Sequence, residues 1–225
     1  MEYTTLFLDL DNTLLDFSKS EEWAITKTLE EFGLPSDSET ARLYSEINNS
    51  YWKRFEKGEI PKNAIFEGRF KTLLSVLKRE GNTKSISEFY CKCLSNTYFK
   101  VEGADEALTY LKNKGYKLYA TTNGFAFTQK NRIKNSGLSK YFDAVFISED
   151  LNAQKPEIEY FEACIRVIPE KDKSKILIVG DSQSSDILGG INVSIDTCWF
   201  KHNGETAKYH SKYTIENLKE LTEIL

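Results

Sequence analysis

An apolar segment near the start of the chain, broken by two closely spaced carboxylates, most constrains what this sequence can fold into. The segment LFLDLDNTL covers residues 6–14 and carries Asp9 and Asp11. Three apolar residues followed by a polar break are typical of a strand that is buried on both faces of a parallel sheet. Ligands bind such sheets beyond the carboxyl ends of the strands, where we expect Asp9, Asp11 and Thr13. Neighbouring carboxylates repel each other, so this position favours a bound divalent cation or a shared proton.

A helical region follows this first strand. Apolar residues recur at helical spacing in four successive segments, which are separated near Gly33, Gly58 and Gly81. We therefore predict an all-helical insertion over residues 17–100. Because the insertion comes directly after the loop with the two carboxylates, we expect it to act as a cap over the carboxyl edge of the sheet.

Helices and buried strands alternate in the rest of the chain. The expected strands cover residues 117–121, 144–147, 175–179 and 197–200. Such alternation is typical of βαβ units with right-handed crossovers, which place helices on both faces of a parallel sheet. The predicted fold class is therefore α/β, with a Rossmann-like parallel sheet core formed by residues 1–16 and 101–225.

Polar residues suited to one kind of chemistry lie at the ends of the expected strands. They are Asp9 and Asp11 after the first strand, Thr122, Asn123 and Gly124 after the second, then Lys155, and finally Asp181 and Asp186 after the strand over 175–179. A phosphoryl group needs an in-line nucleophile, neutralisation of its charge and donors that hold its oxygens. Because parallel strands end at the same edge of a sheet, we expect these residues to form one phosphoryl-transfer site.

The residue types suggest a role for each position. A carboxylate can accept a phosphoryl group as an aspartyl phosphate, so either Asp9 or Asp11 can be the nucleophile, and the other would carry the proton. Asp9, Asp181 and a backbone carbonyl can bind Mg²⁺. Thr122 and the amides after it can donate to a phosphate oxygen, and Lys155 supplies a positive charge.

Each of these motifs also has a common structural explanation. An Asp-x-Asp pair and a Thr-Asn-Gly sequence are typical of turns, Lys-Pro often precedes a helix, and Gly-Asp-Ser often begins one. Turn chemistry alone does not explain why all four occur in this order, each near the end of an expected buried strand.

Composition limits the partners of the chain. The 225 residues are enough for one large domain with a sizeable insertion. The 30 Lys and Arg against 34 Asp and Glu give a net charge of -4 without a long basic segment, which argues against nucleic acid as a partner. No stretch approaches the roughly 18 apolar residues of a membrane span, and no basic segment precedes the first apolar run. We therefore expect a cytoplasmic monomer or homodimer with no membrane partner.

The cysteines and histidines carry no metal-binding pattern. No CxxC spacing occurs among the four cysteines, so we expect reduced thiols and not zinc ligands. They are Cys91, Cys93, Cys164 and Cys198. We also expect His202 and His210, in the polar segment after the last strand, to be exposed, and Asn203-Gly204 to form a turn.

The strand-end residues resemble the four motifs of the haloacid dehalogenase-like hydrolases. The similar segments are DLDNT at 9–13, Thr122, Lys155 and GDSQSSD at 180–186. The resemblance covers nearly the whole chain and implies the fold described above. The helical insertion is similar to the cap that part of this family carries after its first motif.

The resemblance also implies a role for each acidic residue. Asp9 would be the nucleophile, and Asp11 the general acid and base. Magnesium would be bound by Asp9, Asp181 and the carbonyl group of Asp11, while Asp186 would support either the metal or Lys155. The dehalogenase branch of the family lacks a second carboxylate two residues after the nucleophile, so Asp11 indicates a phosphatase.

A narrower resemblance is to the pyrimidine 5'-nucleotidases of this family. It is carried by TNGF at 122–125, SDILGGIN at 185–192 and TCW at 197–199, together with Trp52, Gly58 and Arg69 in the insertion. It implies that the substrates are deoxyuridine, thymidine and uridine monophosphates. Trp52 and Arg69 are then candidates for substrate binding, although aromatic residues at helical spacing more often pack in a core.

Two other interpretations remain open. A phosphosugar phosphatase or phosphomutase on the same scaffold would need cap residues that recognise a sugar. A receiver domain also combines strand-end Asp residues with a Thr and a Lys, but such domains are shorter and lack a helical insertion after the first strand.

Overall fold

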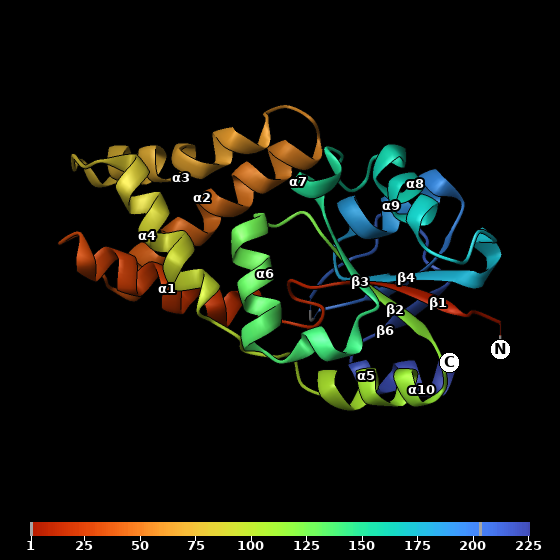
Figure 1. Cartoon of the computed structure of the whole chain (residues 1–225). Coiled ribbons are helices and arrows are strands. Elements are labelled where there is room, and N and C mark those ends of the chain that lie inside the picture. The colour runs from red at the N-terminus through yellow and green to blue at the C-terminus, as the bar shows by residue number, and fades with distance from the viewer. Residues whose placement is uncertain (1, 203) are drawn as a thin grey trace. The chain divides into compact units, whose positions relative to one another are not determined.

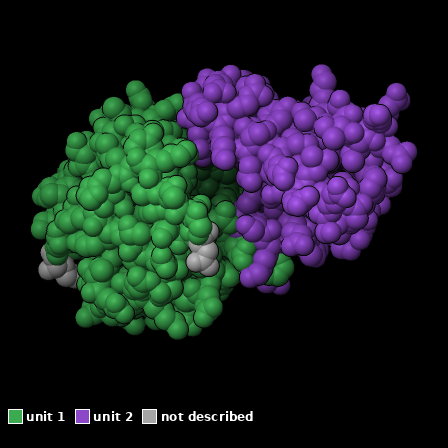
Figure 2. Space-filling model, turned by 180° about the vertical axis from the view of Figure 1, so that it is seen from behind, with its two compact units in different colours: residues 1–16, 99–225 green, residues 17–98 purple. Residues whose placement is uncertain are grey.

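The structure, a computed structural model, describes residues 2–202 and 204–225 (Figure 1). The chain divides into two compact units, one formed by residues 1–16 and 99–225 and the other by residues 17–98 (Figure 2). We call them the core unit and the helical unit and describe each by itself.

The core unit contains a six-stranded sheet in which all neighbouring strands are parallel. The strand order is β3-β2-β1-β4-β5-β6. The strands are β1 (Thr5–Asp9), β2 (Lys117–Thr122), β3 (Ala144–Ile147), β4 (Ile176–Gly180), β5 (Asp196–Phe200) and β6 (Tyr213–Ile215). The predicted α/β class is confirmed, and β2 to β5 begin and end within one residue of the expected positions. The short β6 was not predicted.

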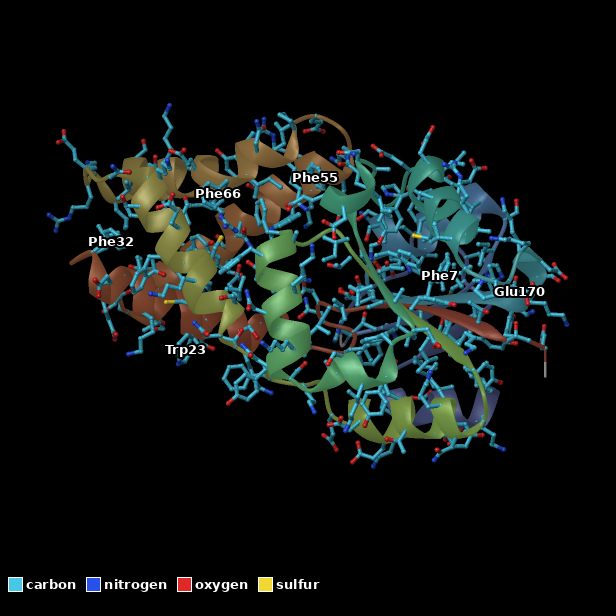
Figure 3. The ribbon with its side chains drawn as sticks, viewed as in Figure 1. Phe7, Trp23, Phe32, Phe55, Phe66 and Glu170 are labelled. Carbon is cyan, nitrogen blue, oxygen red and sulfur yellow. The ribbon has the colours of Figure 1, made fainter. Side chains whose placement is uncertain are left out.

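The side chains of β1 alternate between two apolar clusters, one on each face of the sheet. Leu6 and Leu8 belong to the cluster with α5 (Ala104–Asn113) and α10 (Leu221–Ile224). Phe7 belongs to the opposite cluster with α8 (Ile158–Val167) and is fully buried (Figure 3). Successive residues of a strand point to opposite faces, so a strand covered on both faces must be apolar throughout. The helices therefore cover both faces of the sheet, as expected (Figure 1).

The remaining helical segments of the core unit are short or lie between strands. They are α6 (Ala126–Asn135), α7 (Ser148–Leu151), α9 (Leu188–Val193), a π-helical turn over Gln183–Ile187 that leads into α9, and single 3₁₀ turns over Leu138–Tyr141, Lys173–Lys175 and Leu218–Glu220. The segments that leave and re-enter the core unit run side by side. The Asp16 amide donates to the Phe99 carbonyl oxygen at 2.9 Å, and the Val101 amide donates to that of Leu14 at 3.1 Å.

The helical unit contains four helices around its own apolar core. They are α1 (Phe17–Glu31), α2 (Ser38–Glu56), α3 (Lys62–Leu77) and α4 (Thr83–Ser95). Asp37 caps α2 by accepting a hydrogen bond from the Thr40 amide, and Asn82 caps α4 in the same way. Gly33 and Gly58 follow α1 and α2 with positive φ angles of 61° and 71°, a backbone conformation that glycine adopts without strain. No helix within residues 2–202 or 204–225 has the length and apolar character needed to span a bilayer.

The structure agrees with the expected state of the cysteines and of His210 but not with the expected exposure of His202. All four cysteines are buried free thiols. His210 is exposed, as expected, but His202 is partly buried, and its ring packs against Phe200 with the centroids 4.9 Å apart. Its Nε2 lies 2.8 Å from the Asn12 carbonyl oxygen, because the segment after β5 folds back onto the loop after β1. Asn203 of the expected turn lies outside the described residues.

Candidate active site

The structure brings the polar residues of the strand ends together at one edge of the sheet. Asp9 is the last residue of β1, Thr122 is the last residue of β2, and Asp181 directly follows β4. The register pairs Asp9 with Thr121 on the neighbouring strand. Lys155, from the loop between α7 and α8, extends its ammonium group to the same edge and donates to the Thr121 carbonyl oxygen at 3.2 Å.

Lys155 joins two buried carboxylates. Its Nζ donates to Asp9 Oδ1 at 2.6 Å and to Asp186 Oδ1 at 2.7 Å. Lys155 is 1% exposed and Asp186 is fully buried. Burial alone would lower the pKa of Lys155, but the adjacent Asp186 and Asp9 carboxylates outweigh this effect and raise the pKa. Lys155 therefore remains charged and neutralises part of the negative charge around it.

Three carboxylates in this cluster can hold a metal ion. Ligand oxygens of Asp9, Asp181 and Asp186 all lie within 4.8 Å of one another. Burial raises the pKa of Asp9 to about 7, against the opposing effect of Lys155 and with further contributions from the other acids. Burial, together with the Asp9 and Asp186 charges, also raises the pKa of Asp181 well above its ordinary value. A divalent cation would offset both effects, and carboxylate oxygens are the ligands that Mg²⁺ prefers, so these residues fit a magnesium ion.

The loop after β4 is fixed from three sides. The Asp181 amide donates to Thr13 Oγ1 at 3.1 Å, and Trp199 Nε1 donates to the Asp181 carbonyl oxygen at 2.8 Å. The Ser182 amide donates to Asp186 Oδ2 at 3.2 Å. A Cβ atom at Gly180 would lie 2.3 Å from Asp186 Cγ, so the glycine allows Asp186 to approach the strand end.

Asn123 and Gly124, which we expected to bind substrate, contact other residues of the site. The Asn123 side chain donates from Nδ2 to the Lys155 carbonyl oxygen at 2.8 Å and accepts at Oδ1 from the Lys155 amide at 2.9 Å. The Gly124 amide donates to Thr122 Oγ1 at 3.0 Å. In this structure Asn123 therefore positions the backbone of Lys155, and Gly124 orients the Thr122 hydroxyl.

Asp11 contacts two residues that the sequence interpretation missed. Gln129 Nε2 donates to Asp11 Oδ2 at 2.7 Å, and Arg132 Nη1 donates to Asp11 Oδ1. Both partners are on α6, where Gln129 is 1% exposed and Arg132 is fully buried. Their spacing of three residues on a helix that directly follows the Thr122 motif is the signal that could have identified them. The Asp11 side chain is not part of the three-carboxylate group.

The two candidates for substrate binding in the helical unit differ in exposure: Arg69 is buried and Trp52 is partly exposed. Arg69 is 2% exposed and donates to Asn48 Oδ1 at 2.9 Å, with its guanidinium 4.7 Å from the Tyr90 ring centroid. Trp52 is partly exposed and packs edge-to-face against Phe55 with the centroids 5.8 Å apart. The burial of Arg69 and its contacts favour a structural role inside the helical unit, and its part in substrate binding stays a prediction.

Comparison with known proteins identifies the family of the chain. Residues 6–200 match the family model described as haloacid dehalogenase-like hydrolase. PynA of Streptococcus pneumoniae, named a pyrimidine 5'-nucleotidase, is 35% identical over 100% of this chain and 96% of its own length. A protein of Pyrococcus furiosus named glyceraldehyde 3-phosphate phosphatase is 33% identical over 98% of this chain and 92% of its own.

A solved structure is similar over the whole chain. It is a crystal structure of the HAD-hydrolase YfnB from Bacillus subtilis, described as bound to magnesium, with a TM-score of 0.93 and 32% identity. The alignment covers 100% of this chain and 99% of YfnB. The family match and these similarities confirm what the four motifs predicted: the chain belongs to the haloacid dehalogenase-like hydrolases.

Proposed function

We propose that this protein is a magnesium-dependent phosphatase that hydrolyses pyrimidine nucleoside 5'-monophosphates through an aspartyl-phosphate intermediate. The observation that most supports this proposal is the bridge from Lys155 to Asp9 and Asp186, with Asp181 beside it at the edge of the sheet. The similarity to PynA, over 100% of this chain and 96% of PynA, supports the nucleotide as substrate.

The metal would be held by Asp9 and Asp181, with the Asp11 carbonyl group as a further ligand and Asp186 as a supporting carboxylate. When bound, Mg²⁺ would neutralise negative charge on the phosphate and on the carboxylates. Lys155 contributes a fixed positive charge at Asp9 Oδ1, and its contact with Asp186 keeps its ammonium group in place.

Hydrolysis would proceed in two steps. In the first, a carboxylate oxygen of Asp9 attacks phosphorus, the bond from phosphorus to the ester oxygen breaks, and Asp11 gives its proton to that oxygen. In the second, Asp11 takes a proton from a water molecule that attacks the phosphoryl group, which releases inorganic phosphate and restores Asp9. Thr122 would donate a hydrogen bond to a phosphate oxygen throughout.

We further propose that the helical unit acts as a cap that selects the substrate, with boundaries near the expected residues 17–100. Its insertion directly after the Asp11 loop supports this role, because the core residues described above recognise only phosphate and metal. Trp52, which is partly exposed, is the candidate for stacking on a pyrimidine ring.

The test is a comparison of phosphate release from thymidine and uridine monophosphates with release from hexose phosphates, with and without magnesium. We expect hydrolysis of the nucleotides that depends on magnesium, and we expect Asp9→Asn to lower it by at least about 10³-fold while the fold is retained. If phosphate were released from hexose phosphates as fast as from the nucleotides, the proposal that pyrimidine nucleotides are the substrates would be wrong. Turnover of Asp9→Asn at the parent rate would exclude Asp9 as the nucleophile.

A phosphosugar phosphatase or phosphomutase is the second candidate. The similarity to the Pyrococcus furiosus protein named glyceraldehyde 3-phosphate phosphatase favours the phosphatase form. The same assay distinguishes the candidates if glyceraldehyde 3-phosphate is added to the substrates, because a phosphosugar enzyme would prefer it to thymidine monophosphate.

A further inference from the structure

One face of α6 in the core unit is buried although it is largely polar. Thr128, Gln129 and Arg132 are 3%, 1% and 0% exposed, next to the apolar Ile133. Burial of an amide or a guanidinium group is unfavourable unless the group is hydrogen-bonded. Gln129 and Arg132 both reach Asp11, so this face of α6 is organised around the carboxylate that the proposed function uses for proton transfer.

The neighbours of the Gln129 amide determine its orientation. Nε2 lies 2.7 Å from Asp11 Oδ2 and 2.8 Å from Thr122 Oγ1, and Oε1 accepts from Arg132 Nη1 at 3.1 Å. A carboxylate only accepts hydrogen bonds and a guanidinium only donates them. The reversed amide would therefore bring oxygen against the carboxylate and nitrogen against the guanidinium. Gln129 must donate to both Asp11 and Thr122.

This orientation decides what the Thr122 hydroxyl can do. Its oxygen accepts from Gln129 Nε2 and from the Gly124 amide, at 2.8 and 3.0 Å. A hydroxyl has two acceptor lone pairs and one hydrogen. With both lone pairs engaged, Thr122 can bind a further group only by donating its hydrogen. A phosphate oxygen is an acceptor, so Thr122 is set in advance to bind one.

The same residues fix the Asp11 carboxylate. Oδ1 accepts from Arg132 and Oδ2 accepts from Gln129, so rotation of the carboxylate would break both contacts. The side chain of Asp11 is 28% exposed, whereas that of Arg132 is fully buried. Each carboxylate oxygen has more than one acceptor site, so these two contacts leave further acceptor positions on Asp11.

The backbone of the preceding loop leaves room for this arrangement. A Cβ atom at Gly124 would lie 2.7 Å from Cγ, Cδ and Nε2 of Gln129. Only a residue without a side chain allows Gln129 to cross the loop and reach both Thr122 and Asp11. Gly124 thus supports the same pair of hydrogen bonds from a different part of the chain.

We propose that Gln129 and Arg132 are positioning residues that orient Asp11 for proton transfer and keep the Thr122 hydroxyl as a donor to the phosphate. This inference rests on the proposed function, in which Asp11 protonates the leaving oxygen. In this proposal neither Gln129 nor Arg132 binds the substrate, and both act through the side chains of Asp11 and Thr122 that they hold.

The leaving group of the substrate provides the test. The leaving group of p-nitrophenyl phosphate, nitrophenolate, departs without a proton, whereas the alkoxide that leaves from a nucleotide requires one. Loss of an oriented acid should therefore lower kcat/KM more for the nucleotide than for p-nitrophenyl phosphate. We expect Arg132→Met to lower kcat/KM for thymidine monophosphate by about 10²-fold and that for p-nitrophenyl phosphate by less than about tenfold. Arg132→Lys, which keeps a donor and the charge, should recover part of this difference. If thymidine monophosphate is not cleaved, the best alkyl phosphate of the parent protein replaces it.

Gln129→Met provides a second variant in case Arg132→Met does not fold. It should lower kcat/KM for both esters, because Thr122 loses a hydrogen-bond partner. The loss should be larger for the alkyl ester, because Asp11 also loses a hydrogen-bond partner. Lys134→Met is the matched control, since it removes a charge from an exposed position of the same helix and should leave both rates unchanged. Folding of each variant is checked by circular dichroism and thermal unfolding.

The outcomes separate this inference from the proposed function. Equal losses on both esters in Arg132→Met and Gln129→Met would mean that the two residues only stabilise the fold, and this would overturn the inference while leaving the phosphatase intact. Failure of the parent protein to release phosphate from any ester would overturn the proposed function and, with it, the inference.

Discussion

Each unit of the protein buries a positively charged side chain, but in different surroundings. Lys155 in the core unit is 1% exposed and contacts the carboxylates of Asp9 and Asp186 directly. Arg69 in the helical unit is 2% exposed and contacts a carboxamide oxygen and an aromatic ring. Asn48 links Arg69 to an acid, Glu21, which accepts from the Asn48 side chain at 2.7 Å.

The balance of charge distinguishes the two clusters. In the core cluster Lys155 lies among three carboxylates, those of Asp9, Asp181 and Asp186, whereas in the helical unit Asn48 links Arg69 to the carboxylate of Glu21. Raised pKa values at Asp9 and Asp181 mean that their charged forms cost stability at neutral pH. A cluster with excess charge of one sign needs a ligand, while a balanced cluster can serve the fold alone.

Among the changes that compare the two clusters, the largest effect is expected from Lys155→Met. The variant leaves Asp9 and Asp186 buried without their shared cation, and loss of one partner of a buried ion pair costs about 3–5 kcal/mol. Hydrolysis should fall by at least about 10²-fold, because Asp9 loses the charge that orients it. Urea denaturation and steady-state assays measure the two effects. Parent-like stability together with parent-like turnover would contradict the role given to this bridge.

Arg69→Met is the corresponding change in the helical unit. It should lower the free energy of unfolding by about 3 kcal/mol, because Asn48 loses a buried hydrogen-bond donor and Glu21 loses a neighbouring positive charge. Since Arg69 is buried in this unit, KM for thymidine monophosphate should stay at the parent value when it is measured well below the melting temperature. A clear rise in KM under those conditions would restore Arg69 as a substrate-binding residue.

Binding of magnesium should stabilise the folded protein through the core cluster and not through the cluster of the helical unit. Thermal unfolding can show this without an assay of activity. At a concentration of 100 times its dissociation constant, a ligand of the folded state stabilises it by about 2.7 kcal/mol. Thermal unfolding of the parent protein should therefore shift upward with magnesium, and the shift should disappear in Asp181→Asn. Glu21→Gln, which removes the acid of the other cluster, is the control and should retain the shift. A shift that persists in Asp181→Asn would place the metal elsewhere.

The core cluster could be predicted from the sequence because the carboxyl ends of parallel strands lie at the same edge of a sheet. Once β1, β2 and β4 were identified from their apolar runs, the residues after them had to meet at one edge, however far apart they are in the chain. Asp9, Thr122 and Asp181 could therefore be grouped without any information on long-range contacts.

Contacts between loops and helix faces could not be predicted in this way. Gln129 and Arg132 are polar residues of a helix, and such residues are usually exposed unless a partner from elsewhere in the chain reaches them. His202 contacts Asn12 only because one loop folds back on another. The burial of Arg69 depends in the same way on the packing of α2, α3 and α4. Apart from the spacing of Gln129 and Arg132 on α6, these contacts have no local sequence pattern.

The smallest effect concerns an acid whose pKa is shifted in the opposite direction from that of Asp9. Asp143 accepts from Lys112 Nζ at 2.9 Å, Lys117 Nζ at 3.1 Å and the Leu118 amide at 3.0 Å. Burial alone would raise the pKa of Asp143, but these donors together lower it below the ordinary value. Its contribution to stability is therefore present above the unfolded pKa and is lost as the pH falls through the folded pKa.

Asp143→Asn should thus lower stability at pH 7 by less than about 1 kcal/mol, and the difference from the parent should shrink as the pH falls below about 3.9, the ordinary pKa of an aspartate. Urea denaturation at pH 7 and at a series of acid pH values measures this, with Glu162→Gln, an exposed acid on α8, as the control. A difference of the same size at low pH would mean that packing, and not charge, holds Asp143. A difference confined to neutral pH would support the distinction drawn here, because an acid that serves only the fold is stabilised in its charged form, whereas the acids of the proposed metal site are not.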